Sequence, residues 1–306
     1  MTQIFNGKKT AFHFLQKLQP HINELNTLYK ATPSLSIIRV GENPSSALYV
    51  KNKLKIFKSL GLTAVEHWFN DEISSSDLCT KIQTLNQDSS VHGIILQLPL
   101  PSHLNAQEIC NQINPLKDVD GLTLQNQGLL FQNNLTGLFP CTPLGCTFIL
   151  KALISNLSGK QTLILGRSLL VGKPAALLLL HENATVTMGH SKSQNLPELI
   201  ENSDILISAV GQPNFIKGNW IKKGAVILDV GITKSMIQEQ ETFMGDLEFK
   251  EACLNASFIT PVPGGIGPMT VACLVYNTYK AAKRILTGKP ICYDLSILEN
   301  DLFFFS

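Results

Sequence analysis

Two polar side chains in the first half of the sequence have the types and spacing that acid–base chemistry requires. Tyr49 and Lys53 are four residues apart in a segment predicted to be helical, so both lie on one face of the helix. Burial and polar neighbours bring the pKa of a lysine closer to neutrality, and such a lysine can accept and return a proton. Most Tyr and Lys pairs at this spacing are surface pairs, so the spacing alone leaves both interpretations open.

Gln97 and the carboxylates of a nearby loop are further candidates for substrate binding. Gln97 is the one polar residue in the apolar segment 93–98, and a buried amide without a partner costs free energy. Its partner is either a substrate or the backbone. Asp118 and Asp120 follow Pro115 in a loop, where a carboxylate could accept hydrogen bonds from an amine-bearing ring such as a pterin. Helix capping is the alternative role for these carboxylates.

A glycine-bounded loop in the second half has the features of a phosphate-binding turn. Residues 161–165 are predicted to form a buried strand, the loop runs from Gly166 to Gly172, and a helix is predicted from Pro174. Glycine lets backbone amides approach a pyrophosphate, and a helix N-terminus supplies partial positive charge. The spacing differs from the common GxGxxG pattern, so a simple connecting turn is an equal alternative for the loop taken alone.

The charges around this loop favour NADP over NAD. Enzymes that use NAD commonly have an acidic residue after the second strand, where it bonds a ribose hydroxyl. Here the predicted strand 184–188 leads into His190, Ser191 and Lys192, and Arg167 lies in the first loop. Basic and hydroxyl donors suit a ribose phosphate, and a solvated basic loop is the alternative.

The elements that must position these residues alternate between strand and helix through most of the chain. The 306 residues are 44% apolar and 16% charged, a composition typical of a folded protein with two domains. Residues 100–143 are predicted to be a linker-like, site-forming region, and 261–268 a rigid turn cluster. The alternation predicts an α/β fold with parallel sheets covered on both faces. The predicted strands are 35–40, 63–69, 93–98, 161–165, 184–188, 204–210 and 225–230, and the predicted helices are 9–29, 44–60, 76–85, 144–156, one from Pro174, and 270–286.

Composition also argues against several classes of protein. A net charge of +2 without a basic cluster argues against nucleic-acid binding, and no apolar run approaches the roughly 20 residues of a membrane helix. The N-terminus lacks the pattern of a secretion signal. Seven scattered cysteines without a CxxC pair indicate a reducing compartment and neither a disulfide framework nor a metal site. We therefore expect a cytoplasmic protein that binds no metal.

Taken together, the motifs resemble the bifunctional methylenetetrahydrofolate dehydrogenase/methenyltetrahydrofolate cyclohydrolase family. They occur in the family's order through most of the chain, at 40–53, 93–101, 115–121, 140–145, 166–179, 190–193, 204–213, 227–232, 245–249 and 260–270. The resemblance implies oxidation of 5,10-methylenetetrahydrofolate to the methenyl form with NADP, followed by hydrolysis to 10-formyltetrahydrofolate. It also implies a place in one-carbon metabolism, with purine and amino-acid biosynthesis as the pathways served.

The resemblance also assigns roles to individual residues. Its catalytic lysine corresponds to Lys53, the aromatic residue that stacks on the pterin to Tyr49, the glutamine that tunes the lysine to Gln97, and the pterin-binding carboxylate to Asp120. Further substrate-binding residues are Leu98, Pro263, Gly264 and Gly265. The cofactor-binding residues are Gly166, Arg167, Ser168, Ser191 and, through its backbone, Ile232.

The fold implied by the resemblance has two domains with the active cleft between them. Residues 1–140 would form the folate-binding catalytic domain, to which residues 269–306 return, and 141–268 the Rossmann-like NADP-binding domain with a parallel sheet. The family is usually a homodimer, so we expect one here. The tail with Phe303, Phe304 and Phe305 extends beyond the resemblance.

Two other functions are compatible with parts of the sequence. A monofunctional NAD(P) dehydrogenase acting on another small substrate would lack the set of Tyr49, Lys53, Gln97 and Asp120, which this chain has. A non-catalytic dinucleotide-binding protein would keep Gly166 and lose the reactive side chains. An assay with methylenetetrahydrofolate and each nicotinamide cofactor distinguishes the three.

Overall fold

The computed structural model describes residues 2–237 and 240–294, which divide into two compact units. The three-stranded unit consists of residues 15–141 and 273–293, and the six-stranded unit takes the other described residues. Each unit is built around one parallel sheet. The predicted α/β class with two domains is therefore confirmed.

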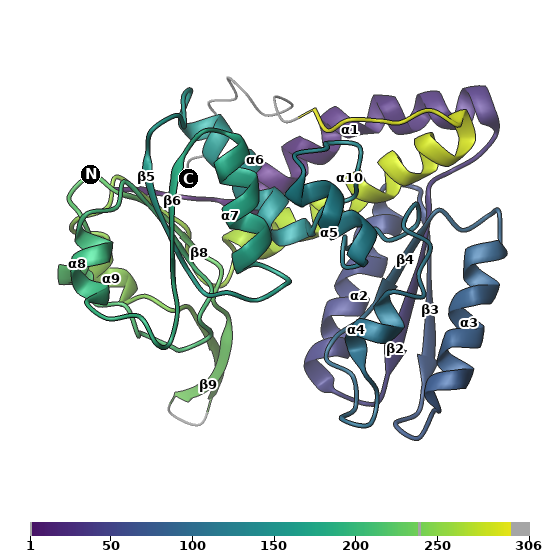
Figure 1. Ribbon diagram of the computed structural model, residues 1–306, viewed down its shortest axis with the longest axis horizontal. Helices are drawn as coiled ribbons and strands as arrows, with labels where there is room; N and C mark the ends of the chain where they lie inside the picture. Colours follow the sequence, from purple (N-terminus) through teal and green to yellow (C-terminus); the bar gives the residue numbers. More distant parts are fainter. Residues whose placement is uncertain (1, 238–239, 295–306) are drawn as a thin grey trace. The chain divides into compact units, whose positions relative to one another are not determined.

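The sheet of the three-stranded unit has helices on both faces. Its strands β2 (Ser34–Val40), β3 (Thr63–Phe69) and β4 (Gly93–Leu96) are parallel, in the order β3-β2-β4. The first connection runs from β2 to β3 on one side, and the second runs from β3 across β2 to β4 on the other side. Because both crossovers are right-handed and run in opposite directions, their helices lie on opposite faces of the sheet. Figure 1 shows α2 (Pro44–Ser59) and α3 (Ser75–Gln87) on the two sides of this sheet.

Local signals in the sequence set the ends of α2. The side chain of Asn43 accepts a hydrogen bond from the backbone amide of Ser46, and Pro44 occupies the first helical position, where its missing amide is not needed. Gly61 follows the helix with a φ of 70°, a conformation that costs glycine little. The predicted start of this helix at Pro44 is confirmed, and the helix ends at Ser59, one residue before its predicted end.

The segment predicted to be linker-like contains two short helices, α4 (Ala106–Cys110) and α5 (Leu124–Phe131). Asn105 caps the first by accepting bonds from the amides of Gln107 and Glu108, and Thr123 caps the second. Helices of five and eight residues are too short to show a clear apolar period. Only their caps could have indicated them.

The six-stranded unit contains a doubly wound parallel sheet. Its strand order is β1-β11-β8-β7-β5-β6, and every pair is parallel. The chain passes from β5 outward to β6 and then back across to β7, so the winding direction reverses between β5 and β7. In open α/β sheets, ligands bind at the carboxyl ends of the strands at such a reversal. The bounds are β1 (Gln3–Ile4), β5 (Gln161–Leu165), β6 (Thr185–Gly189), β7 (Ile205–Ser208), β8 (Val226–Asp229) and β11 (Phe258–Ile259).

The strands predicted in this half are confirmed to within three residues at each end, whereas several connecting elements were not predicted. An antiparallel hairpin of β9 (Thr233–Ile237) and β10 (Gln240–Met244) extends from the sheet (Figure 1). This hairpin was not predicted, because its polar sequence lacks the apolar alternation that usually indicates a strand. The helices here are α6 (Cys141–Leu153), α7 (Gly172–His181), α8 (Leu196–Glu201), the short 3-10 helix at Gly218–Trp220 and α9 (Phe249–Ala252).

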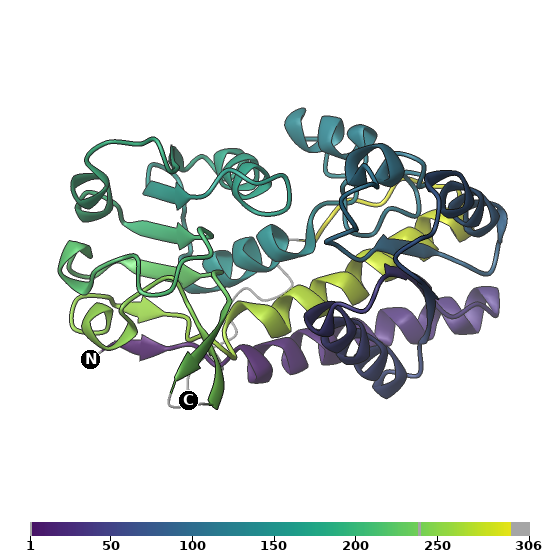
Figure 2. The same ribbon diagram turned by 90° about the horizontal axis from the view of Figure 1, so that it is seen from below.

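Two long helices, α1 (Gly7–Tyr29) and α10 (Ile266–Thr287), each contribute residues to both units. Figure 2 shows them side by side, and the rings of His21 and Tyr279 lie 6.3 Å apart. The helix α10 begins four residues before its predicted start, with Pro268 in its first turn, where a proline is tolerated. None of the described helices combines the length and apolar character needed to cross a bilayer.

The N-terminus differs from the predicted boundary of the first domain. Strand β1 pairs with β11 in the six-stranded sheet, so residues 2–14 belong to that unit and not to the unit formed by most of 1–140. A two-residue strand carries no periodic signal, which is why the sequence did not indicate it. Of the segment 269–306 predicted to return to the first domain, residues 273–293 pack in the three-stranded unit, whereas 269–272 belong to the six-stranded unit. Residues 295–306 of the predicted returning segment, including the phenylalanine tail, lie outside the described residues.

Candidate active site

Lys53 and Gln97 form the centre of a polar cluster in the three-stranded unit. Lys53 lies on α2, Gln97 directly follows β4, and the lysine Nζ donates a 2.9 Å hydrogen bond to the glutamine Oε1. The amide nitrogen of Gln97 donates to the carbonyl oxygen of Leu98 at 2.9 Å. This second bond fixes which end of the amide faces the lysine. Both side chains are half-buried, so the amine is held in place while one side remains open.

Asp120 joins this cluster through the thiol of Cys141. The buried Cys141 sulfur lies within hydrogen-bonding reach of the Asp120 carboxylate, and of the Val119 carbonyl oxygen at 3.4 Å. Burial raises the pKa of the Cys141 thiol well above its usual value; the charge of Asp120 raises it further and that of Lys53 lowers it. The thiol is thus hydrogen-bonded to Asp120 and lies within electrostatic range of Lys53. Cys141 was not among the predicted site residues, although it lies in the motif at 140–145.

Tyr49 is on the same helix as Lys53, one turn earlier. Its side chain remains 41% exposed, and partial burial raises the pKa of its hydroxyl. The group is therefore a neutral phenol near neutral pH. An exposed ring beside the lysine is available to pack against a flat ligand.

The loop that carries Asp120 is held in place by hydrogen bonds to the carboxylate of Asp118. Asp118 is buried, and it accepts hydrogen bonds from the amides of Leu122 and Thr123 and from the side chain of Asn126, at 2.8 to 3.1 Å. Burial raises the pKa of Asp118, and these bonds oppose the shift. The two carboxylates of this loop thus have different surroundings: Asp118 is buried and accepts three hydrogen bonds from its own loop, whereas Asp120 is only half-buried.

The same loop is also fixed from helix α10. The side-chain amide of Asn277 donates to the carbonyl oxygens of Val119 and Phe139, both at 2.8 Å. The hydroxyl of Tyr293 donates to the Asn277 side-chain oxygen at 2.7 Å and accepts from the Phe139 amide at 2.8 Å. All four groups are buried, and Val119 immediately precedes Asp120. The sequence placed neither Asn277 nor Tyr293 near the site.

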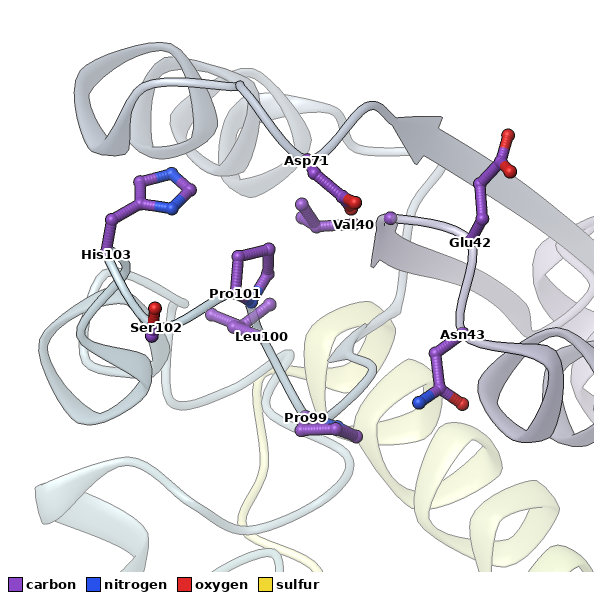
Figure 3. Close-up of a pocket in the computed structure, with 10 residues that line it drawn as sticks. Val40, Glu42, Asn43, Asp71, Pro99, Leu100, Pro101, Ser102 and His103 are labelled. Atoms are coloured by element: carbon purple, nitrogen blue, oxygen red, sulfur yellow. The ribbon is translucent and has the colours of Figure 1, made fainter.

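A separate cavity of about 520 Å³ lies at the carboxyl ends of the three parallel strands (Figure 3). It is lined by Val40, Gly41, Glu42, Asn43, Asp71, Pro99, Leu100, Pro101, Ser102 and His103. Figure 3 shows Asp71 close to Val40 and Glu42 pointing away from the other labelled side chains. Tyr49, Lys53, Gln97 and Asp120 do not line it. This cavity and the polar cluster are therefore different sites of one unit.

In the six-stranded unit a cavity of about 250 Å³ lies at the reversal between β5 and β7. It brings together four of the predicted cofactor residues, Gly166, Arg167, Ser168 and Ser191. The remaining lining residues are Leu165, His190, Leu196, Ala209, Val210, Gln212 and Phe215. The last four come from the segment after β7 and were not among the predicted site residues, although the first three of them lie in the motif at 204–213.

The turn from β5 to α7 requires glycine at both ends. Gly166 has a φ of 120°, and a Cβ there would lie 2.5 Å from the carbonyl oxygen of Ala209. A Cβ on Gly172 would lie 2.1 Å from the carbonyl oxygen of Gly166. The hydroxyl of Ser168 accepts a bond from the amide of Val171 at 3.1 Å and closes the loop. The turn therefore leaves space for a ligand to approach the backbone.

The chemistry of this lining fits NADP. The guanidinium of Arg167 and the hydroxyl of Ser191 are exposed at the cavity, and His190 accepts the Lys192 amide at Nδ1, which leaves its Nε2 as the protonated nitrogen of the neutral ring. Cationic and hydroxyl donors of this kind suit a phosphate. Within residues 2–237 and 240–294, no group of three or more His, Cys, Asp or Glu could hold a metal ion.

Other predicted residues lie outside these groups. Ile232 follows β8, is 46% exposed and is not among the residues that line the cavity. Pro263, Gly264 and Gly265 lie between β11 and α10 in the six-stranded unit. The Gly264 carbonyl accepts the Gly7 amide at 3.0 Å, so this loop is joined to the start of α1.

Comparison with known proteins gives a consistent match along both units. Residues 5–120 match the catalytic domain of the tetrahydrofolate dehydrogenase/cyclohydrolase family, and residues 140–286 match its NAD(P)-binding domain. The bifunctional protein FolD of Wolbachia pipientis from Culex pipiens is 46% identical over 282 residues, which cover 92% of this chain and 96% of that protein.

Solved structures agree in fold as well as in sequence. The bifunctional FolD enzyme of Campylobacter jejuni is 38% identical with a TM-score of 0.89, covering 93% of this chain and 99% of that one. The FolD enzyme of Trypanosoma brucei, solved with NADP cofactor and inhibitor, is 33% identical, also with a TM-score of 0.89, covering 92% of this chain and 98% of that one.

Proposed function

Because the chain belongs to the tetrahydrofolate dehydrogenase/cyclohydrolase family, we propose that it converts 5,10-methylenetetrahydrofolate to 10-formyltetrahydrofolate in two steps. The first step is oxidation to 5,10-methenyltetrahydrofolate with NADP, and the second is hydrolysis of the methenyl form. The observation that carries this proposal is the hydrogen-bonded pair of Lys53 and Gln97, together with Cys141, which is hydrogen-bonded to Asp120 and within electrostatic range of Lys53. The relatives named FolD are bifunctional, and the Trypanosoma brucei enzyme binds NADP.

We assign the folate half of the site to the three-stranded unit and the dinucleotide half to the six-stranded unit. The family's catalytic-domain match lies mostly in the former, and its NAD(P)-binding match covers the strands of the latter from β5 to β11. Asp120 is assigned to the amine-bearing ring of the pterin, since a carboxylate accepts two such bonds. Tyr49 is assigned to the face of that ring.

In the dehydrogenase step the protein needs to orient its substrate more than to supply a strong base. Loss of hydride from the methylene carbon leaves a methenyl cation that is stabilised by the adjacent nitrogens. When bound, NADP supplies the hydride acceptor. Asp120 and Tyr49 contribute by holding the pterin in one orientation, because correct alignment supplies a large part of the rate acceleration of such a transfer.

The cyclohydrolase step requires proton transfer, which we assign to Lys53. Water adds its oxygen to the methenyl carbon and loses one proton, which leaves a hydroxyl group on that carbon. The bond from the carbon to N5 then breaks and N5 gains a proton, while the hydroxyl loses its remaining proton and becomes the carbonyl of the formyl group on N10. The net products are 10-formyltetrahydrofolate and one proton. The amine of Lys53 can accept the first proton and donate the second at Nζ. Gln97 holds Nζ through its Oε1 atom.

The two alternative functions are not favoured. A monofunctional dehydrogenase for another substrate, or a non-catalytic dinucleotide-binding protein, would have no use for an amine held by an amide next to a carboxylate. The family match covers the catalytic domain as well as the NAD(P)-binding domain.

A spectrophotometric assay tests the proposed function directly. The purified chain is given 5,10-methylenetetrahydrofolate with NADP or with NAD, and the absorbance of the methenyl product is followed; preformed methenyltetrahydrofolate is supplied separately to measure hydrolysis. We expect both reactions, with NADP preferred over NAD. If neither cofactor gave methenyl product, the dehydrogenase activity would be excluded. If methenyltetrahydrofolate decayed at the same rate with and without the protein, the cyclohydrolase activity would be excluded.

We further propose a cytoplasmic homodimer that supplies one-carbon units for purine and amino-acid biosynthesis. The support is the family's usual assembly, together with scattered cysteines and a net charge of +2, which gives no reason to expect a nucleic-acid partner. Sedimentation equilibrium should give twice the chain mass of 33.6 kDa. A concentration-independent monomer would exclude the dimer.

A further inference from the structure

Two neighbouring carboxylates lie buried in the six-stranded unit, and the proposed reaction uses neither. Asp229 ends β8 and Asp246 follows β10, with exposures of 3% and 0%. Burial, and then the charge of Asp246, raise the pKa of Asp229 to about 7. Removing two nearby carboxylates from water is costly unless their hydrogen bonds serve the structure around them.

Asp246 directs its carboxylate at the segment that follows β7. Its Oδ2 accepts hydrogen bonds from the Ser208 hydroxyl and the Val210 amide, both at 2.8 Å, and its Oδ1 accepts from the Gln212 amide at 2.9 Å. Three donors from five consecutive residues thus meet a single side chain. A segment without regular secondary structure is held in one conformation by bonds to an ionic acceptor, which are stronger than bonds between neutral groups.

This segment is one wall of the nucleotide cavity. Ala209, Val210 and Gln212 all line it. The Ala209 carbonyl oxygen would lie only 2.5 Å from a Cβ on Gly166, so the segment is in close contact with the glycine turn after β5. A displacement after β7 would therefore move both sides of the cavity.

Asp229 fixes Asp246 in turn. It accepts hydrogen bonds from the amides of Gly231, Asp246 and Leu247 at 3.0 to 3.3 Å. A Cβ on Gly245 would lie 2.0 Å from the Asp229 carboxylate, and one on Gly231 would lie 2.1 Å from that of Asp246. The carboxylates thus occupy space that any other residue at these two positions would fill.

We propose that Asp246 is a positioning residue for the dinucleotide, which holds the segment 208–212 as a wall of the cofactor cavity, and that Asp229 supports it. This inference rests on the proposed function, because it takes the cavity between β5 and β7 as the NADP site. Both carboxylates belong to the six-stranded unit, whereas the folate half of the site is assigned to the other unit. Their loss should therefore affect NADP and leave hydrolysis of methenyltetrahydrofolate intact.

The test is Asp246→Asn in the full chain. A carboxamide has a single acceptor oxygen and directs its NH2 group at one or more of the three donors, so at least one is left unpaired. We expect the Kd for NADP, measured by calorimetry, to rise by about ten-fold or more, because each lost charge-assisted bond corresponds to roughly a factor of ten. Hydrolysis of preformed methenyltetrahydrofolate, which needs no NADP, should stay within about two-fold of wild type.

Asp118→Asn is the matched control, because Asp118 is also buried and also accepts three hydrogen bonds, but in the three-stranded unit. It should raise the KM for folate substrates in both reactions and leave the Kd for NADP unchanged. Ser208→Ala removes one of the three donors to Asp246 and should raise the Kd for NADP by a smaller factor. If Asp246→Asn does not fold, the Kd of Ser208→Ala for NADP tests the inference in its place.

An unchanged Kd for NADP in Asp246→Asn, or in Ser208→Ala where the first variant fails to fold, would overturn the inference. So would parallel losses of NADP binding and hydrolysis, which would indicate a general loss of folding. The wild-type measurements separate this failure from that of the proposed function. A wild-type chain that binds no NADP would overturn both, whereas wild-type binding with an unaffected Asp246→Asn variant would overturn only the inference.

Discussion

Lys53 differs from the other lysines of its helix because Gln97 accepts a hydrogen bond from its amine. The exposed Lys51 and Lys55 lie on the same helix, whereas Lys53 is half-buried and bonded to a residue 44 positions away in the chain. A surface lysine samples many rotamers, and one held by an amide presents its amine in one direction. The geometry therefore favours Lys53, among the four lysines of this helix, for the proposed proton transfer.

Replacing Lys53 by Met should remove the proton carrier while keeping most of the side-chain volume. We expect cyclohydrolase kcat to fall by about a hundred-fold or more, since general acid–base catalysis contributes roughly that factor. The Kd for NADP should not change. Lys51→Met, on the exposed side of the same helix, is the control and should retain full turnover. Near-intact hydrolysis in Lys53→Met would refute the assigned role.

Tyr293→Phe should weaken folate binding through the loop that carries Asp120. The variant leaves the Asn277 side-chain oxygen and the Phe139 amide without their partner, and buried unpaired groups cost about 1–3 kcal/mol. We expect a several-fold higher KM for methylenetetrahydrofolate and an unchanged KM for NADP.

The control for this variant is Tyr279→Phe, which removes a hydroxyl that accepts only the nearby Lys283 amine in the described contacts, at 3.1 Å. It should leave both KM values unchanged. Equal effects of the two substitutions on folate KM would show that the Tyr293 network does not position Asp120.

At the level of secondary structure, the turn between β5 and α7 depends on backbone that approaches backbone. Gly166→Ala would place a methyl group 2.5 Å from the Ala209 carbonyl oxygen at a φ that other residues rarely adopt. We expect the Kd for NADP to rise by about ten-fold or more, because the turn or the segment after β7 must move.

Gly159→Ala provides a matched comparison for this turn. Gly159 precedes β5 with a φ of 74°, but a Cβ there would meet nothing within 4 Å. Both variants share the cost of a positive φ, and only Gly166→Ala adds the steric contact. If the two variants bound NADP equally well, the close approach at Gly166 would not matter for the cofactor.

Helix α10 contributes a buried lysine whose charge should make stability depend on pH. Burial lowers the pKa of Lys280 to about 6, and its Nζ donates to the carbonyl oxygens of Leu135 and Gly137 at 2.7 and 2.6 Å. A neutral amine has two hydrogens, which match these two acceptors. At pH values between about 6 and 10.5, Lys280 is protonated in the unfolded chain and neutral in the folded protein. The free energy of unfolding therefore increases as the pH rises above about 6, and this contribution of Lys280 is lost as the pH falls back to about 6.

Lys280→Met should remove this pH dependence. Urea unfolding at pH 7, 8 and 9 should show the difference in unfolding free energy between wild type and variant growing in favour of wild type, by up to about 1.4 kcal/mol per pH unit. Lys283→Met, one turn later and half-buried, should show no such trend. Parallel curves for wild type and Lys280→Met would mean that Lys280 keeps its proton in the folded protein.

For the whole molecule, we expect the two long helices to make the two units unfold together. Because α1 and α10 each contribute to both units, unfolding one unit would break both helices in the middle. Trp68 lies in the three-stranded unit and Trp220 in the six-stranded unit, and they are the only tryptophans of the chain. Each is therefore a fluorescent reporter of its own unit.

We expect Trp68→Phe and Trp220→Phe to show the same unfolding midpoint in urea, as a cooperative chain requires. NADP at about a hundred times its Kd should raise both midpoints together, corresponding to roughly 2.7 kcal/mol. Two separate midpoints, with only the Trp220 transition responding to NADP, would show that the units unfold independently.

What the sequence alone determined is mainly local. The cap of α2 at Asn43, the apolar strands of both sheets and the glycine turn at Gly166 were all predictable, because propensity, periodicity and turn chemistry depend on neighbours within a few residues. The order of its motifs was enough to indicate the family. Elements too short to show a period, such as β1 and the helices α4 and α5, were not predictable for the same reason.

Only the tertiary structure decided which distant residues meet. The partner of Lys53 is Gln97, Cys141 lies beside Asp120, and Asp246 holds the segment after β7. The two residues of the first contact are 44 positions apart and those of the second are 21 apart, while Asp246 is 34 to 38 positions from the residues it holds. No local pattern encodes them, since the strand order and the packing of helices on the sheets bring these segments together.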